Sequence, residues 1–300
     1  MLSAWVVFPA AVICVQILAA VVWRVHGRSA AWVMLAFSAA ALLCVWVSFE
    51  ALPIERWRHG SLVVSLAVFS LPAAAATCAA VLRARRRHGS ARLPWRSWAW
   101  LAALWTGPAL LLYVSQLAPF TGSSLPDISF ANCMWWAATS VAIYVAIPVV
   151  YARIAGQRIR GYGLSLGFVR TEAGFVLLVA PVILVLVWLA SADERFRLTY
   201  PFYDVAHGGD NAWAKLIAFE IAYGATFVAL EFFFRGFLVF AGAPVLGVHA
   251  VPAMAFAYCL LHLGKPLPEC AISLVGGLIL GYVALRVRSI AAGEIGRAHV

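Results

Sequence analysis

Long apolar runs separated by short polar connections dominate the pattern of this chain. A helix needs about 20 mostly apolar residues to cross the hydrocarbon core of a bilayer. Nine runs reach or approach that length: 4–23, 31–49, 61–82, 97–117, 133–152, 174–191, 213–240, 249–264 and 268–287. The pattern predicts an all-α fold, a polytopic transmembrane helical bundle of about nine spans.

Composition and charge agree with this class. The chain has 300 residues, of which 64% are hydrophobic and 11% are charged, whereas soluble domains are about half apolar and about a quarter charged. The net charge of +10 comes from basic residues in the connections, which is typical of membrane topology and not of nucleic-acid binding. We therefore expect the lipid bilayer as a partner, and no nucleic acid.

The basic residues fall in alternate connections, around 24–28, 83–96, 153–170 and 286–288, while the other connections are poor in base or balanced by acid. Positive charge marks cytoplasmic connections. The bias toward arginine and alanine indicates a GC-rich bacterial genome. We therefore predict a multi-pass protein of the cell inner (plasma) membrane, with its N-terminus outside and residues 83–96 in the cytoplasm.

Few ionisable groups lie at membrane depth: Glu220, Glu231, Arg235 and His262, with Glu269 near a helix start. A charge at that depth costs roughly 2.5–3.5 kcal/mol on insertion scales, so each needs a physical reason. Eleven helical residues make about three turns, which puts Glu220 and Glu231 on one face. Arg235 follows Glu231 at i+4, the favourable order for a helical ion pair.

A helical hairpin would bring His262 to the same membrane depth as Glu231. The short connection around Ala243–Gly247 predicts antiparallel helices with a turn near residue 246, and Glu231 and His262 lie 15 residues before and 16 after it. Carboxylate and imidazole together suit the activation of a water, with Arg235 fixing the carboxylate or an oxyanion. A structural polar cluster that holds helices together is the alternative.

Three segments of this region carry a family resemblance. They are EFFFRGFL, FAYCLLHLGKPLPE and GLILGYVALRVRSI, and they resemble the CPBP family of intramembrane proteases, which is related to the type II CAAX-prenyl endopeptidases and the bacteriocin-processing (Abi-like) proteins. The likeness covers residues 161–293, while 1–160 are transmembrane helices without recognised likeness. It implies an endopeptidase that cleaves a membrane-associated peptide or protein.

The resemblance also implies roles for individual residues. Arg235 matches the arginine of the first family motif, Glu231 matches the second of its two adjacent glutamates, and His262 matches the first histidine. Tyr258 holds the aromatic place four residues before that histidine. Leu230 stands where the first glutamate of the motif belongs, which is the departure from the family pattern.

This departure leaves the carboxylate chemistry open. We expect Glu231 to activate water, His262 to support the water or the oxyanion, and Arg235 to orient Glu231, with Tyr258 in support. Alternatively Glu220 or Glu269 supplies a second carboxylate, or the chemistry is altered.

A divalent metal such as zinc fits the family. One histidine and one carboxylate, however, are fewer ligands than a zinc site uses.

A non-enzymatic membrane protein is the rival class. It would be a transporter or a scaffold with a structural Glu–Arg–His cluster. Transporters usually show inverted repeats or helix pairs broken by glycine and proline, and neither is evident in this sequence.

The last seven residues generate a prediction of their own. The family's final helix and its second histidine should follow Gly293, but the sequence continues EIGRAHV, which is the translation of the sequencing-adapter read GAG ATC GGA AGA GCA CAC GTC. We expect 294–300 to be an adapter artefact, the final core helix to be missing, and residues 1–300 to be inactive. Resequencing the locus tests this, and a natural frame that ends in EIGRAHV would contradict it.

Overall fold

The computed structural model describes residues 4–50, 61–117, 119–120, 125–164, 203 and 211–290, and every regular element within them is helical. The all-α prediction is confirmed. The elements are α1 Ala4–His26, α2 Arg28–Glu50, α3 Leu62–His88, α4 Trp95–Val114, α5 Leu125–Ala155, η2 Ile159–Tyr162, α8 Ala212–Glu231, η5 Phe232–Leu238, α9 Val239–Leu246, η6 Gly247–His249, α10 Ala250–Leu261 and α11 Leu267–Val287.

Seven helical segments within the described ranges are long and apolar enough to cross a membrane: Val7–His26, Arg28–Phe49, Leu62–His88, Trp95–Val114, Ser129–Ala155, Ala212–Leu261 and Leu267–Arg286. This confirms a multi-pass membrane protein, with seven candidate spans where the sequence predicted about nine. The predicted spans 213–240 and 249–264 both fall in the segment Ala212–Leu261, because its helical residues continue through the short η6 turn. The predicted span 174–191 lies outside the described residues.

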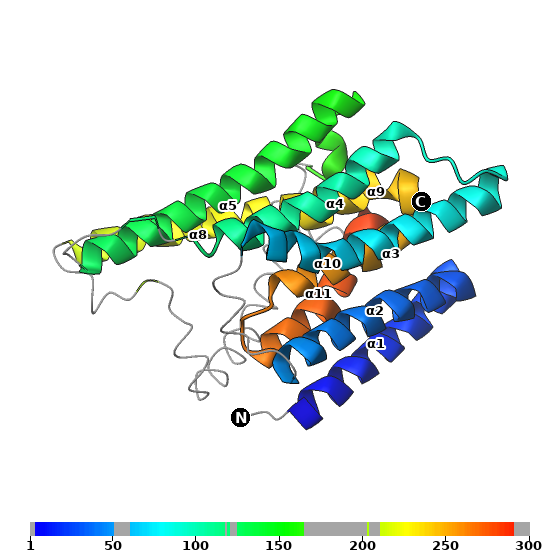
Figure 1. The fold of residues 1–300 in the computed structure, drawn as a ribbon, viewed down its shortest axis with the longest axis horizontal. Coiled ribbons are helices and arrows are strands. Elements are labelled where there is room, and N and C mark those ends of the chain that lie inside the picture. Colours follow the sequence, from blue (N-terminus) through cyan, green and yellow to red (C-terminus); the bar gives the residue numbers. More distant parts are fainter. Residues whose placement is uncertain are drawn as a thin grey trace.

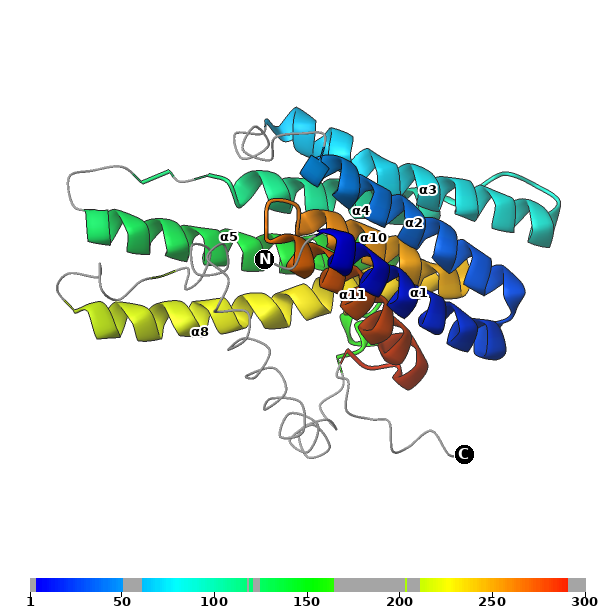
Figure 2. The same ribbon diagram turned by 90° about the horizontal axis from the view of Figure 1, so that it is seen from below.

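Helices α1 to α5 alternate in direction along the bundle, α8 runs parallel to α5, and α10 and α11 run opposite to each other (Figures 1 and 2). The connection between α1 and α2, that between α3 and α4, the end of α5, the η6 turn and the end of α11 all lie at one end, which we call the basic end. The described parts of the predicted basic connections, 24–28, 83–96, 153–164 and 286–288, therefore lie at the same end of the bundle.

Helix α10 lies at the centre of the bundle. It packs against α2, α3, α4, η5, α9 and α11, and Figure 2 shows it between the α1–α2 pair and α4. Every residue from Ala250 to Ala257 is buried. Alanines predominate in this stretch, and small residues allow neighbouring helices to approach closely in lipid. The position of α10 determines where His262, the residue that follows it, can lie.

The segment FFFRGFL forms a π-helix, η5, between α8 and α9. A π-helix has i→i+5 hydrogen bonds and is often found at functional sites. The buried Trp100 indole of α4 donates from Nε1 to the carbonyl oxygen of Leu238, at 3.2 Å. Gly242 permits this approach, because a Cβ atom there would lie 2.5 Å from an indole carbon. The packing of α4 against η5 and α9 therefore depends on a glycine.

Two glycine-to-alanine variants test that packing. Gly242→Ala should lower thermal stability in detergent, because overpacking a tight core costs about 1–3 kcal/mol. Gly224→Ala is the matched control, since nothing lies within 4 Å of its Cβ position and alanine favours a helix by about 0.5–1 kcal/mol. The melting temperatures of the two variants, measured by size-exclusion chromatography after heating, should shift in opposite directions. Equal melting temperatures would contradict the close contact.

Candidate functional site

A buried guanidinium lies at the centre of the site. Arg235 Nη1 lies 2.9 Å from Glu231 Oε1, and the two side chains are 3% and 34% exposed. Within the described part of the chain, neither Nη1 nor Nε of Arg235 has an aligned hydrogen-bond partner. The guanidinium carbon lies 4.2 Å from the centre of the Tyr258 ring, a cation–π contact. The carboxylate of Glu231 and the ring of Tyr258 together compensate the cost of burying the guanidinium.

The imidazole of His262 follows on the other side of Tyr258. The two ring centroids are 4.6 Å apart, and His262 Nδ1 lies 2.8 Å from the carbonyl oxygen of Tyr258. A carbonyl oxygen only accepts, so Nδ1 carries the proton and Nε2 is the acceptor nitrogen of the neutral ring. Cys270 Sγ donates to the carbonyl oxygen of His262 at 2.7 Å, which fixes the turn between α10 and α11.

The predicted hairpin is confirmed by these contacts. Chain direction reverses at Gly247–His249, and Arg235 meets Tyr258 across the hairpin. Tyr258 separates the ion pair from His262, however, so the groups form a series and not one cluster. The sequence placed Glu231 and His262 at equal depth but could not show that an aromatic ring lies between them.

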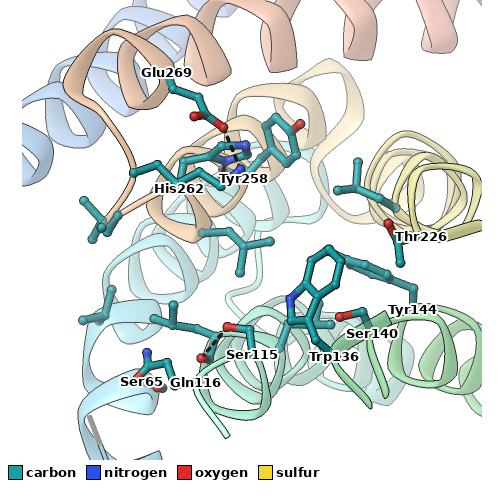
Figure 3. Close-up of a pocket in the computed structure, with 18 of the residues that line it drawn as sticks. Ser65, Ser115, Gln116, Trp136, Ser140, Tyr144, Thr226, Tyr258, His262 and Glu269 are labelled. Carbon is teal, nitrogen blue, oxygen red and sulfur yellow. Dashed lines mark hydrogen bonds and ion pairs between the residues drawn. The ribbon is translucent and has the colours of Figure 1, made fainter. Parts of the chain in front are cut away.

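A cavity of about 480 Å³ opens beside His262 (Figure 3), bounded by α3, α4, α5, α8, α10 and α11. One wall carries Tyr258, His262 and Glu269, and polar groups from other helices face it. Its lining consists of Val64, Ser65, Val68, Leu111, Leu112, Ser115, Gln116, Trp136, Ser140, Tyr144, Tyr223, Thr226, Phe227, Leu230, Tyr258, Leu261, His262, Leu263, Gly264, Lys265 and Glu269. The cavity lies toward the end of the bundle opposite the basic end.

The carboxylates are distributed unevenly around this cavity. Glu269 lines it and pairs with Lys265, with Oε1 2.6 Å from Nζ. Glu231 does not line it, whereas its neighbour Leu230 does. Glu220 is exposed on α8 and is also outside the lining. Of the three carboxylates that the sequence put forward, Glu269 is therefore the one that shares a cavity with His262.

Sequence reasoning missed the polar groups on the far walls. Ser140, Trp136 and Thr226 lie inside apolar runs and line the cavity. Thr226 Oγ1 donates to the carbonyl oxygen of Tyr223 at 2.6 Å, so its lone pairs stay available to accept. A search for isolated hydroxyl residues within the apolar runs could have found Ser140 and Thr226.

The described residues include no group of three or more His, Cys, Asp or Glu side chains that could hold a metal ion. His262 and Glu269 would supply two ligands, which is fewer than the three protein ligands of a catalytic zinc site. The geometry therefore supports no complete metal centre in this part of the chain.

No family model, curated protein or solved structure matches this chain. The resemblance to intramembrane proteases therefore stays a prediction from the quoted segments. What the structure supports is a helical, multi-pass membrane protein with a cavity lined by apolar and polar side chains.

A double-mutant cycle on the buried ion pair gives a direct test of the geometry. Breaking a fully buried pair costs about 3–5 kcal/mol, and the cost of Glu231→Gln should fall below that because its side chain is 34% exposed. Arg235→Met should also destabilise, while the double variant should recover most of the loss. Melting temperatures in detergent measure the cycle. Additive losses would show that the two side chains do not interact.

Proposed function

We propose that this protein is an intramembrane endopeptidase that hydrolyses a peptide bond in a membrane-associated peptide or protein. The observation that carries the proposal is the imidazole of His262, which lines a cavity inside a helical bundle beside Glu269. Imidazole and carboxylate at one cavity wall are the groups that activate water for hydrolysis. The resemblance of the surrounding segments to the CPBP family supports the same activity.

The tautomer of His262 suits a general base. Its Nδ1 proton is held by the carbonyl oxygen of Tyr258 at 2.8 Å, so Nε2 can take a proton from a water. The water oxygen bonds to the substrate carbonyl carbon, and an oxyanion forms. The imidazolium then returns the proton to the amide nitrogen as the carbon–nitrogen bond breaks. Lys265 lies on the same wall and is placed to stabilise the oxyanion.

Among the carboxylates, the cavity favours Glu269 as the group that contacts the water. In this proposal Glu231 acts at a distance, through its ion pair with Arg235 and the contact of Arg235 with Tyr258. Arg235 and Tyr258 are then positioning residues, because they set the orientation of the imidazole without contacting substrate. Glu231 as the base, which the sequence favoured, remains the alternative within the same reaction.

The cavity also suits an extended peptide. When a substrate segment unwinds from its helix in an apolar environment, its backbone N–H and C=O groups need new hydrogen-bond partners. Ser115, Ser140 and Thr226 offer hydroxyls among leucine and valine side chains on the cavity walls. With the predicted orientation, the cavity faces the outer half of the membrane, so a substrate would enter from that side.

One observation favours the rival, non-enzymatic function. The ion pair packs against Tyr258 and does not reach the cavity, as a purely structural cluster would. In that case the cavity would bind or pass a solute, and the polar residues would be there for packing and hydration.

Cleavage in proteoliposomes distinguishes the two functions. The protein, expressed from its own gene, is reconstituted with single-span peptides that carry a fluorophore and a quencher, and products are identified by mass spectrometry. His262→Ala and Glu269→Gln should each lower kcat at least 100-fold, as expected for lost acid–base catalysis of about 10²–10⁴. Glu220→Gln is the matched control, because its exposed carboxylate is outside the cavity, and it should cleave like the parent.

Tyr258 adds a test of positioning. Tyr258→Phe keeps the ring that contacts Arg235 and His262, so kcat should be retained, whereas Tyr258→Leu should lose kcat with little change in KM. Folded protein that cleaves none of the peptides, or a His262→Ala variant as active as the parent, would refute the protease proposal.

A further inference from the structure

The basic end of the bundle gathers positive charge around the start of α10. His26 comes from α1, Arg83 and Arg86 from α3, and His249 from the η6 turn. No aspartate or glutamate occurs in the surrounding segments 19–35, 78–103, 148–164, 239–257 and 280–290. The two arginines therefore have no acidic side chain from these segments to balance them; together with the two histidines we call them the α10 cluster.

Arg83 packs directly on the turn that begins α10. Gly247 has φ +65° and ψ −139°, a conformation that is essentially restricted to glycine. A Cβ atom at Gly247 would lie 2.6–2.8 Å from the guanidinium nitrogens and carbon of Arg83. The absence of a side chain at this position thus brings the guanidinium against the backbone at the start of the central helix.

This position is electrostatically unfavourable for a cation by itself. A helix N-terminus carries a partial positive charge from its unpaired N–H groups. His249 also lies within electrostatic range of Arg83, Arg86 and His26. Within the described residues, the buried His249 Nδ1 has no hydrogen-bond partner. An anion at this point would relieve the repulsion and could accept hydrogen bonds from several of these groups.

The cluster is accessible from outside the protein. Arg86 and His26 are exposed, and Arg83 is half-buried. The His26 ring stacks on Tyr282 of α11, with centroids 6.0 Å apart, which holds the imidazole beside the cluster. Arg83 and Arg86 are near the end of the candidate span Leu62–His88, where a helix leaves the hydrocarbon and meets the headgroups.

We propose that the α10 cluster binds a phosphate group, that of an anionic lipid headgroup at the membrane surface. Guanidinium matches phosphate geometry with two parallel hydrogen bonds, and basic pockets between transmembrane helices on the cytoplasmic side hold anionic headgroups. The cluster and the cavity of the proposed protease are at opposite ends of α10, so this site does not depend on that function.

Lipid binding in nanodiscs tests the proposal. Native mass spectrometry compares retention of phosphatidylglycerol with that of phosphatidylcholine, and the parent protein should prefer the anionic lipid at least tenfold. Arg83→Gln should remove most of this preference. Arg85→Gln is the matched control: it removes the same charge from an exposed residue of the same helix that is not among the groups interacting with His249. It should change binding less than twofold.

Two further arms complete the design. Arg83→Lys keeps the charge but loses the planar fork of the guanidinium, so its preference for the anionic lipid should lie between those of the parent and Arg83→Gln. It also replaces Arg83→Gln in the test if that variant does not fold. Inorganic phosphate at millimolar concentration distinguishes the source: poor competition supports a lipid headgroup, and full competition supports a site for soluble phosphate. An equal loss in Arg83→Gln and Arg85→Gln, or no preference for either anion, would overturn the proposal.

Discussion

The buried guanidinium of Arg235 constrains the centre of this structure. The residue is 2% exposed, and a buried charge is costly unless it is paired. Glu231, in the preceding turn, supplies the counter-charge, but it is the last residue of α8, which continues directly into η5. The second compensating group, the Tyr258 ring, comes from α10 across the hairpin. Folding α10 back against η5 is therefore part of how the cation is tolerated, and it brings His262 beside Tyr258.

The aromatic run before and after Arg235 makes this arrangement rigid. Phe233, Phe234 and Phe237 are completely buried. Phe233 contacts Tyr144 of α5 with ring centroids 5.6 Å apart, and Phe234 contacts Tyr258 at 5.0 Å. Such pairs contribute about 0.5–1.5 kcal/mol each beyond the area they bury. The π-helix thus lies inside an aromatic shell that joins α5 to α10, which limits how far the cation, the ring and the imidazole can move apart.

Helix α10 gives the molecule two chemically different ends. Its first turn is beside the arginines of α3 and the histidine of η6, while its last turn leads to His262 and the cavity. The imidazole donates to a carbonyl of that last turn, which satisfies one of the acceptors that every helix leaves unpaired at its C-terminus. The apolar, alanine-rich middle of α10 has no ionisable side chain. The two proposals therefore place anion binding and hydrolysis at separate ends of one helix.

Much of this could be predicted from the chain alone, because hydropathy, helical spacing and a short connection are local properties. They predicted the membrane class, the Glu231–Arg235 pair and the hairpin that brings the end of α10 against Arg235. Eight of the nine predicted apolar runs fall on described helices. Only the tertiary structure decided that Tyr258 lies between Arg235 and His262, that Leu230 and Glu269 face the cavity while Glu231 does not, and that Arg83 packs on Gly247. Those outcomes depend on the π-helical turn and on the rotation of each helix against its neighbours, and the spacing of residues along one helix contains no information about either.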